Sequence, residues 1–403
     1  MMPDLLPTLA IHGSAPTFPA PLHVGRPNIG DREQLLTYIN AMLDRRWLTN
    51  RGPLVQEFEQ RLAAYLGVKH CITTCNATVA LEIAIRAAGL HGEVIVPSFT
   101  FVATAHALQW QAITPVFCDV DPTTHCINPR MVEALITPRT TGIIGVHVWG
   151  QACAIEELRA VADHHHLRLL FDAAHAFGCT HHGHMIGSFG DAEVFSFHAT
   201  KFFNTFEGGA VTTNDDVLAA KIRLMTNFGF AGYDSVIYIG TNGKMSEVSA
   251  AMGLTGLDAL DEFITVNRRN YYAYQQALHD IPGVHLLSYD EREQCNYQYI
   301  VAEINANEAG IQRDTLVKVL HAENVLARRY FYPGVHRMEP YRSYFPHAYL
   351  LLPETECLTQ RVLILPTGTA VQPEDIAKIG TIIRTAVHHG ATLEAQLAEP
   401  VVH

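Results

Sequence analysis

The sequence predicts an α/β protein with a mainly parallel sheet flanked by helices, followed by a smaller α+β domain. Between residues 70 and 213, short β-branched and apolar runs alternate with amphipathic helical segments. Such alternation is typical of a parallel sheet that is covered on both faces. After about residue 250 the alternation gives way to a long helical stretch and then to mixed strands and helices.

The predicted sheet has seven strands, at residues 71–75, 93–98, 114–120, 142–149, 168–174, 192–197 and 208–213. Only a loop separates the last two, so we expect an antiparallel or irregular closing portion there. Segments 77–89 and 154–166 each place apolar residues on one helical face, and they should pack against the sheet.

The second half of the chain is expected to form a separate unit. Residues 245–280 have the pattern of a nearly continuous helix, which Pro282 and Gly283 end. A strand at 298–304 and helices at 314–324 and 373–390 come after it. A chain of 403 residues favours two domains. We therefore predict an N-terminal extension (1–24), a large domain (25–260) and a small domain (261–403), with the long helix as the bridge.

Composition excludes several classes of partner. The net charge of −12 argues against a nucleic-acid partner or an anionic membrane surface. The N-terminal residues do not have the pattern of a signal peptide, and no stretch is apolar enough to span a bilayer. The eight cysteines are scattered without a CxxC pair, which favours reduced thiols and a cytoplasmic location.

Histidines gather in two places, His164 to His166 and His181, His182 and His184. Either group could be a metal cluster. However, neighbouring histidines on one helix point in different directions, and no thiolates stand at zinc spacing. The sequence therefore predicts no metal site, and solvated or interfacial histidines instead.

Ligands of parallel α/β sheets bind at the carboxyl ends of the strands, so the residues just after the strands are the site candidates. Asp172 ends a buried strand, and a carboxylate there needs a cationic partner or its pKa rises. Lys201 lies between small residues and two phenylalanines, where a desolvated amine would be a nucleophile toward carbonyls. A helix cap for Asp172 and a structural role for Lys201 remain alternatives.

Three further features complete a pattern. Asn76, Ala77 and Thr78 open a helix, whose N-terminus would bind a phosphate, or form a plain cap. Ser196 could add a hydroxyl, and Phe101 could lie over an aromatic ring or pack in the core. Together these residues suit one ligand, pyridoxal phosphate (PLP). It has a phosphate, a ring nitrogen that pairs with a carboxylate and an aldehyde that reacts with an amine.

The chain resembles the DegT/DnrJ/EryC1/StrS family of sugar-nucleotide aminotransferases, which share the type I, aspartate-aminotransferase-like PLP fold. The resemblance runs from about residue 24 to 370 and includes PSFTFVATAHAL, FDAAHAFG, SFHATKFFNTFEGGA and TNGKMSEVSAAMGL. It implies a Schiff-base role for Lys201, a pyridinium partner in Asp172 and a ring neighbour in His175. It also implies a stacking aromatic in Phe101, phosphate ligands in Thr78 and Ser196, and Asn242 reaching the phosphate from the other subunit of a homodimer.

Two positions bear on these expectations. The family's usual Ser-Gly-Thr turn reads Asn76-Ala77-Thr78, which leaves the phosphate geometry open because alanine lacks glycine's freedom. Relatives with histidine in place of the lysine are dehydratases, so Lys201 favours transamination.

The resemblance implies transfer of an amino group, with L-glutamate the family's usual donor, to C4 of TDP-4-keto-6-deoxy-D-glucose. A C3 aminotransferase acting on a TDP-3-keto-6-deoxyhexose is the alternative, and a PLP-dependent dehydratase and a PLP-binding regulator without turnover rank below it. Candidate substrate contacts are Lys244, Arg328, Arg329, Tyr330, Tyr332 and His336.

Overall fold

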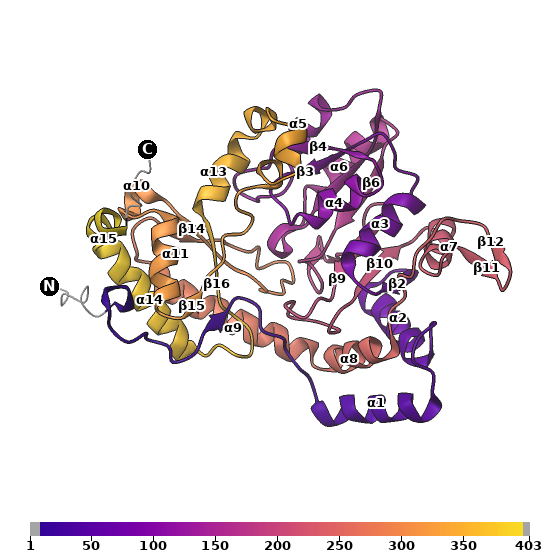
Figure 1. Ribbon diagram of the computed structural model, residues 1–403, viewed down its shortest axis with the longest axis horizontal. Coiled ribbons are helices and arrows are strands. Elements are labelled where there is room, and N and C mark those ends of the chain that lie inside the picture. The colour runs from indigo at the N-terminus through magenta and orange to yellow at the C-terminus, as the bar shows by residue number, and fades with distance from the viewer. Residues whose placement is uncertain (1–8, 398–403) are drawn as a thin grey trace.

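The computed structural model describes residues 9–397 (Figure 1). Residues 1–8 of the predicted N-terminal extension and 398–403 of the predicted small domain lie outside the described residues. A seven-stranded sheet with the order β2-β10-β9-β6-β5-β3-β4 forms the centre of the molecule. The contacts between β4, β3, β5, β6 and β9 are parallel, whereas β10 runs antiparallel to both of its neighbours. The predicted fold class and the antiparallel closing portion are thus confirmed.

Each predicted strand of this sheet is present. The bounds are β2 (His70–Thr74), β3 (Glu93–Pro97), β4 (Thr114–Cys118), β5 (Thr140–Val146), β6 (Arg168–Asp172), β9 (Ala192–Ser196) and β10 (Gly209–Thr213). Alternate side chains of β6 face two different cores. Leu169 and Phe171 pack on one face, and Leu170 packs on the other, as the two-residue period of a strand requires.

Helices cover both faces of the sheet. One core contains side chains of α3 (Ala77–Ala87), α4 (Ala103–Gln109) and α7 (Asp216–Met225). The opposite core contains α2 (Pro53–Leu66), α5 (Pro129–Ala134), α6 (Ile155–His164) and α8 (Glu247–Asp258). Helix α1 (Arg32–Arg45) lies along α8 at the lower edge of Figure 1. Because both faces are covered, the strands are apolar runs without strict alternation.

The predicted long helix is two helices. The backbone leaves helical geometry at Ala259 (φ −103°, ψ 7°), where α8 ends and α9 (Leu260–Leu278) begins. Helix α9 packs against α14 (Pro373–His388) beside an antiparallel sheet of β13 (Val284–Leu286), β14 (Ile300–Ile304) and β16 (Val362–Leu365). Helix α11 (Arg313–Ala322) joins the same core, and β1 (Leu22–His23) pairs with β15 (Val325–Leu326).

The chain returns to the large sheet after β15. Phe331 packs in the core that contains α6, and Val335 and Tyr341 pack in the core that contains α3. This return places residues 328–340 beside the carboxyl edge of the sheet. The smaller elements of this part are α12 (Tyr341–Tyr344) and α13 (Pro353–Arg361), and α15 (Gly390–Leu397) comes after α14. Among the described residues, no helix has the length and hydropathy needed to cross a bilayer.

Candidate active site

The strand register brings the predicted site residues to one edge of the sheet. Gly209, which begins β10, lies opposite both Thr74 at the end of β2 and Ser196 at the end of β9. Asp172, which ends β6, lies beside Val146 at the end of β5. The turn before α3, Asp172, Ser196 and the segment leading to Lys201 therefore share one edge, as the topology predicts.

Lys201 is largely buried and is held by a residue that is distant in the sequence. Its Nζ donates a hydrogen bond of 2.9 Å to the hydroxyl oxygen of Tyr299, which stands just before β14. Burial lowers the pKa of Lys201 from 10.5 to about 8, although Tyr330 and Asp172 oppose the shift. An amine with such a pKa is neutral in a useful fraction of molecules near neutral pH, as a nucleophile or base requires.

Asp172 is 5% exposed and accepts two hydrogen bonds. The Thr104 hydroxyl donates to Oδ2 at 2.8 Å, and the Ala174 amide donates to Oδ1 at 3.1 Å. Burial raises the pKa of Asp172, and these two bonds and the charge of Lys201 only partly oppose that rise. The carboxylate therefore lacks a strong cationic partner, and a protonated ring nitrogen would supply one.

His175 stands in a cluster of aromatic rings. Its ring packs against Trp149, Tyr299 and Phe331, with centroids 4.5 to 5.9 Å away. Nδ1 accepts a hydrogen bond of 3.3 Å from the Trp149 amide. Burial, and secondarily the charge of Lys201, lower the pKa of His175 well below its ordinary value. The imidazole is thus neutral and fixed in orientation.

The N-terminus of α3 fits a phosphate group. The Asn76 side chain accepts from the Val79 amide at 2.9 Å, which leaves the amides of Ala77 and Thr78 without intrahelical partners. Ala77 is the first helical residue, so this turn does not need glycine's freedom, which answers the question raised by the sequence. Gly209 packs closely here, since a Cβ at that position would lie 2.7 Å from the Ala77 nitrogen.

Three further predicted cofactor contacts border this edge. Phe101 is 60% exposed, so its ring face is open, and it precedes the helix that carries Thr104. Ser196 is half-buried at the end of β9. Asn242 is exposed, and its backbone lies beside the turn of its own chain, because the Cys75 amide donates to the neighbouring Gly243 oxygen at 2.8 Å.

The candidate substrate residues divide into groups. Arg328 and Tyr330 line a pocket of about 300 Å³ together with Tyr299 and Thr200, directly beside Lys201. The Arg328 guanidinium lies 5.3 Å from the centre of the Tyr330 ring. This pocket therefore places the cation of Arg328 near the Lys201 amine.

Three other candidates lie elsewhere. Arg329 forms an ion pair of 2.9 Å with Asp314 of α11 and lies over the Tyr332 ring, so both residues are engaged with that helix. Lys244 donates to the Asn227 side chain at 2.9 Å and pairs through its backbone with Thr74, close to the turn before α3.

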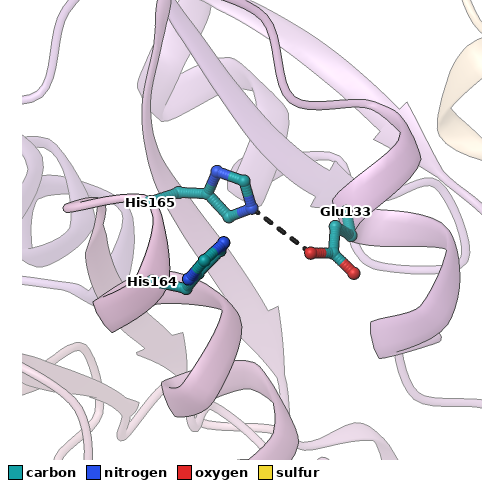
Figure 2. Close-up of side chains that lie close together, drawn as sticks. All are labelled: Glu133, His164 and His165. Carbon is teal, nitrogen blue, oxygen red and sulfur yellow. Dashed lines mark hydrogen bonds and ion pairs between the residues drawn. The ribbon is translucent and has the colours of Figure 1, made fainter.

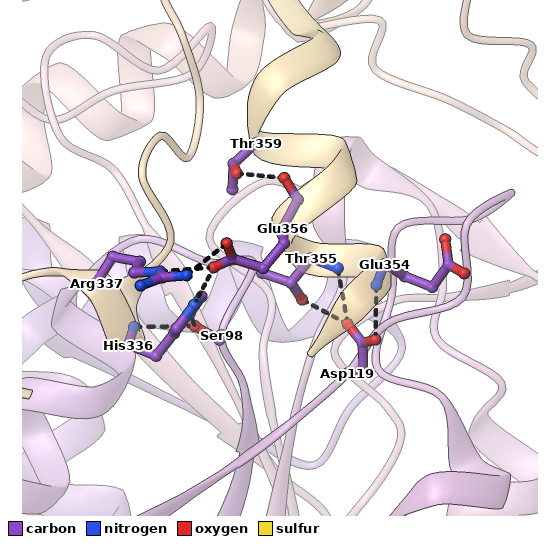
Figure 3. Close-up of polar contacts among 8 residues, drawn as sticks. All are labelled: Ser98, Asp119, His336, Arg337, Glu354, Thr355, Glu356 and Thr359. Atoms are coloured by element: carbon purple, nitrogen blue, oxygen red, sulfur yellow. Dashed lines mark hydrogen bonds and ion pairs between the residues drawn. The ribbon is translucent and has the colours of Figure 1, made fainter. Parts of the chain in front are cut away.

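His336 is buried in a polar network (Figure 3). Its ring nitrogens are 2.7 Å from the Ser98 hydroxyl and 2.5 Å from a Glu356 oxygen. Asp119, just after β4, holds the adjoining helix, accepting from the amides of Glu354 and Thr355 at 2.8 Å each. Because both ring nitrogens are bonded and the residue is 2% exposed, His336 offers no free atom to a sugar.

Three residues outside the sequence-based prediction complete the site. Thr104 binds Asp172, Tyr299 binds Lys201, and Trp149 binds and stacks on His175. Thr104 lies inside the block PSFTFVATAHAL, which could have drawn attention to it. Tyr299 is 98 residues from Lys201 in the chain, and no local pattern marks that contact.

Comparison with known proteins gives a consistent answer. Residues 30–384 match the model of the DegT/DnrJ/EryC1/StrS aminotransferase family. A dTDP-4-amino-4,6-dideoxy-D-glucose transaminase of Shigella dysenteriae is 38% identical over 80% of this chain and 87% of its own. The transaminase of the same name from Escherichia coli is 34% identical over 89% and 97%. A GDP-perosamine synthase of Caulobacter vibrioides is 36% identical over 79% and 86%.

Solved structures agree with the fold. The crystal structure of DesI, determined in the presence of its TDP-sugar product, superposes with a TM-score of 0.94 at 52% identity. It covers 98% of this chain and all of its own. DesV of S. venezuelae, in complex with a ketimine intermediate, gives 0.82 at 28% identity over 90% and 99%. The chain therefore belongs to the DegT/DnrJ/EryC1/StrS aminotransferase family and is a sugar aminotransferase.

Proposed function

We propose that the enzyme uses PLP to transfer an amino group from L-glutamate to C4 of TDP-4-keto-6-deoxy-D-glucose, giving TDP-4-amino-4,6-dideoxy-D-glucose. One observation carries this proposal. A relative 52% identical over nearly the whole chain was solved in the presence of its TDP-sugar product. The names of two further relatives, both transaminases of this 4-amino sugar, support the C4 position. One relative is named a GDP-perosamine synthase, so the choice between TDP and GDP as the nucleotide of the substrate needs a test.

The residues at the sheet edge fit PLP. Lys201 is a buried amine with a lowered pKa, which suits the aldehyde of PLP. Asp172 is a buried carboxylate without a strong cationic partner, which suits the ring nitrogen. The amides at the N-terminus of α3 suit the phosphate. The residues that would hold it are Lys201, Asp172, His175, Phe101, Asn76, Ala77, Thr78, Ser196 and Asn242. When bound, PLP supplies an electron sink for the carbanion that forms as the amino group leaves or arrives.

Lys201 has two tasks in this proposal. It would hold the aldehyde at rest and, as a free amine, would carry a proton to and from the reacting carbon. With a pKa of about 8, about one tenth of the free amine is neutral at pH 7. The Tyr299 hydroxyl fixes the direction of the amine, because it accepts from Nζ at 2.9 Å.

Asp172 and His175 hold the ring in place. The ionised carboxylate of Asp172 would keep the ring nitrogen of the bound cofactor protonated, which would strengthen the electron sink. Thr104 and the Ala174 amide hold the carboxylate in position. Neutral His175, aligned by the Trp149 amide, would contact the ring.

The sugar nucleotide should enter through the pocket beside Lys201. Arg328 is a cation of that pocket, and the Tyr330 ring lies next to it. Lys244 lies on the other side of the site, near the turn before α3. Arg329 and Tyr332, which contact α11, are secondary candidates, and we leave His336 out of the proposed substrate contacts because its ring is buried and bonded.

We also propose a homodimer with shared active sites, working in the cytoplasm. Segment 228–239 supports the dimer, because it exposes the large apolar side chains of Phe228, Phe230, Tyr233, Val236, Ile237 and Ile239. This segment leads directly to Asn242, the residue proposed to reach the partner's phosphate. The eight cysteines are free thiols, as expected in a reducing compartment.

The product distinguishes the alternatives. The enzyme is incubated with PLP, nitrogen-labelled L-glutamate and TDP-4-keto-6-deoxy-D-glucose, and the position of the label on the product is read by NMR. Label on C4 supports the proposal. A TDP-3-keto-6-deoxyhexose is tested in parallel, and labelled nitrogen on C3 of its product, with no labelled product from the 4-keto sugar, would favour the alternative regiochemistry. Faster turnover of a GDP-linked 4-keto sugar would overturn the TDP assignment.

A further inference from the structure

Two groups of histidine and glutamate side chains lie at opposite ends of α6. Glu156 in the first turn of the helix meets His181 and His182, and His164 and His165 at the last turn meet Glu133. In each group, the possible ligand atoms all lie within 4.8 Å of one another. Neither group contains a residue of the proposed cofactor site.

The first group depends on an unusual backbone conformation. His181 ends β7 (Thr180–His181), and His184 begins β8 (His184–Met185), so His182 stands in the turn of a hairpin. His182 has a φ of +50°, in the left-handed region. Adjacent side chains of an extended strand point to opposite faces, but this turn brings the two imidazole rings to 4.1 Å between centroids. The expectation of diverging side chains concerned histidines on one helix, whereas these two lie on a hairpin.

Glu293 holds this turn from a third segment. Its carboxylate accepts from the His182 amide at 2.7 Å, the Gly183 amide at 3.2 Å and the Thr180 hydroxyl at 2.6 Å. The turn is thus fixed by contacts that do not involve the imidazole rings. Both histidines are presented as a preformed pair that faces Glu156.

The distances suit one metal ion. His181 Nε2 is 3.1 Å from both oxygens of Glu156, and His182 Nε2 is 3.9 Å from one of them. Ligand atoms held about 2.0–2.2 Å from a tetrahedral Zn²⁺ lie roughly 3.3–3.6 Å from one another. Small side-chain rotations would bring all three donors onto one ion. A pocket of about 490 Å³, lined by both histidines, leaves room for further ligands.

The second group is less well prepared. Figure 2 shows His165 and His164 on the end of α6 with Glu133 opposite, and the contact from His165 to Glu133 is 3.4 Å. His164 and His165 are consecutive at a helix end, with ring planes at 88°. Their ring centroids are 4.7 Å apart, compared with 4.1 Å for His181 and His182. The second group is therefore a competing site, and the experiment below removes it by mutation.

We propose that Glu156, His181 and His182 bind one divalent transition-metal ion of the Zn²⁺ class, with water in the remaining position. The site offers two imidazole nitrogens and one carboxylate oxygen. This donor set binds Zn²⁺-class ions in preference to Mg²⁺ or Ca²⁺, which favour oxygen ligands alone. The ion joins the first turn of α6 to the hairpin of β7 and β8. The role of the ion is to hold these elements together. It has no part in the reaction, because neither Lys201 nor Asp172 belongs to α6 or to this hairpin.

Zn²⁺ binding to the tag-free, PLP-loaded full chain tests this site. Affinity is measured by competition with a chromogenic chelator, in a background where His164→Asn and His165→Asn remove the second group. We expect one equivalent of Zn²⁺ per chain, and at least about tenfold weaker binding in His182→Asn and in Glu156→Gln. His184→Asn, an exposed histidine of the same hairpin, is the matched control and should keep full affinity.

Two results would overturn the proposal. One is the absence of a bound equivalent in the background protein, and the other is equal affinity in His182→Asn and His184→Asn. Circular dichroism and the PLP absorption band confirm that each variant is folded. Since His182 and Glu156 are both exposed, we expect their replacement to leave the fold intact. Co²⁺ provides a second measurement, because its visible spectrum reports the coordination number and geometry of the bound ion.

Discussion

Replacing Lys201 by methionine should stabilise the PLP-free protein. Burial lowers the pKa of this lysine from 10.5 to about 8. Each pKa unit corresponds to about 1.36 kcal/mol, so keeping the ammonium group in the folded protein costs about 3 kcal/mol at neutral pH. Methionine has a similar length and no charge. We therefore expect Lys201→Met to raise the free energy of unfolding by about 2–3 kcal/mol at pH 7.

The pH dependence gives the sign of the effect. Below pH 8 the lysine is charged in both the folded and unfolded states, and the full cost is present. Between pH 8 and 10.5 the folded state releases its proton first, so the unfolded state binds more protons and stability rises with pH. The advantage of Lys201→Met should therefore shrink across this window and vanish above it.

Urea unfolding of PLP-free wild-type protein and variant, at pH 7 and at pH 10, measures this difference. Taking the difference between the two proteins removes the contribution of other groups that titrate in the same window. Lys378→Met, an exposed lysine on α14, is the matched control and should show little change at either pH. A Lys201→Met variant that is no more stable than wild type at pH 7 would refute the argument that burial perturbs this amine.

Three other predictions concern the site and its surroundings. Asp172→Asn should lower kcat by about 10²–10³-fold with PLP still bound, because the ring nitrogen loses its carboxylate; an unchanged kcat would contradict that role. In the wild-type protein the Glu354 amide donates to a carboxylate oxygen of Asp119, and in Asp119→Asn it would face the NH₂ group of the new side chain. We therefore expect Asp119→Asn to lower the free energy of unfolding by about 1–3 kcal/mol, and an unchanged urea midpoint would contradict this. Mixing inactive Lys201→Ala and Asn242→Ala subunits should restore part of the activity through hybrid dimers; no recovery after proven subunit exchange would argue against a shared site.

Local sequence was enough to predict the sheet and the residues at its edge. The strands are β-branched runs bounded by turn residues, and a parallel sheet places the residues after each strand on one edge. Asp172 and Ser196 could therefore be assigned to one site before any contact was known. The N-terminus of α3 was recognisable for the same reason, since Asn76 stands between a strand and an apolar helical pattern.

Contacts between distant segments could not be predicted in this way. The hydrogen bond from Lys201 to Tyr299 joins two parts of the chain whose packing depends on the whole fold. His336 is a polar residue in a tyrosine-rich segment and was expected in the sugar pocket, yet Ser98 and Glu356 bind it in the interior. The left-handed turn at His182 reverses the direction of one side chain and carries no sequence signal beyond the glycine next to it.

The absorption spectrum of the purified protein with PLP tests the central claim most directly. L-glutamate is added first and TDP-4-keto-6-deoxy-D-glucose second, with the Lys201→Met variant run in parallel. We expect a visible band in the wild-type protein that bleaches with L-glutamate and returns with the keto sugar, and no such cycle in the variant. A wild-type protein that forms no band with PLP, or whose band responds to neither compound, would contradict the assignment of Lys201 and the proposed reaction.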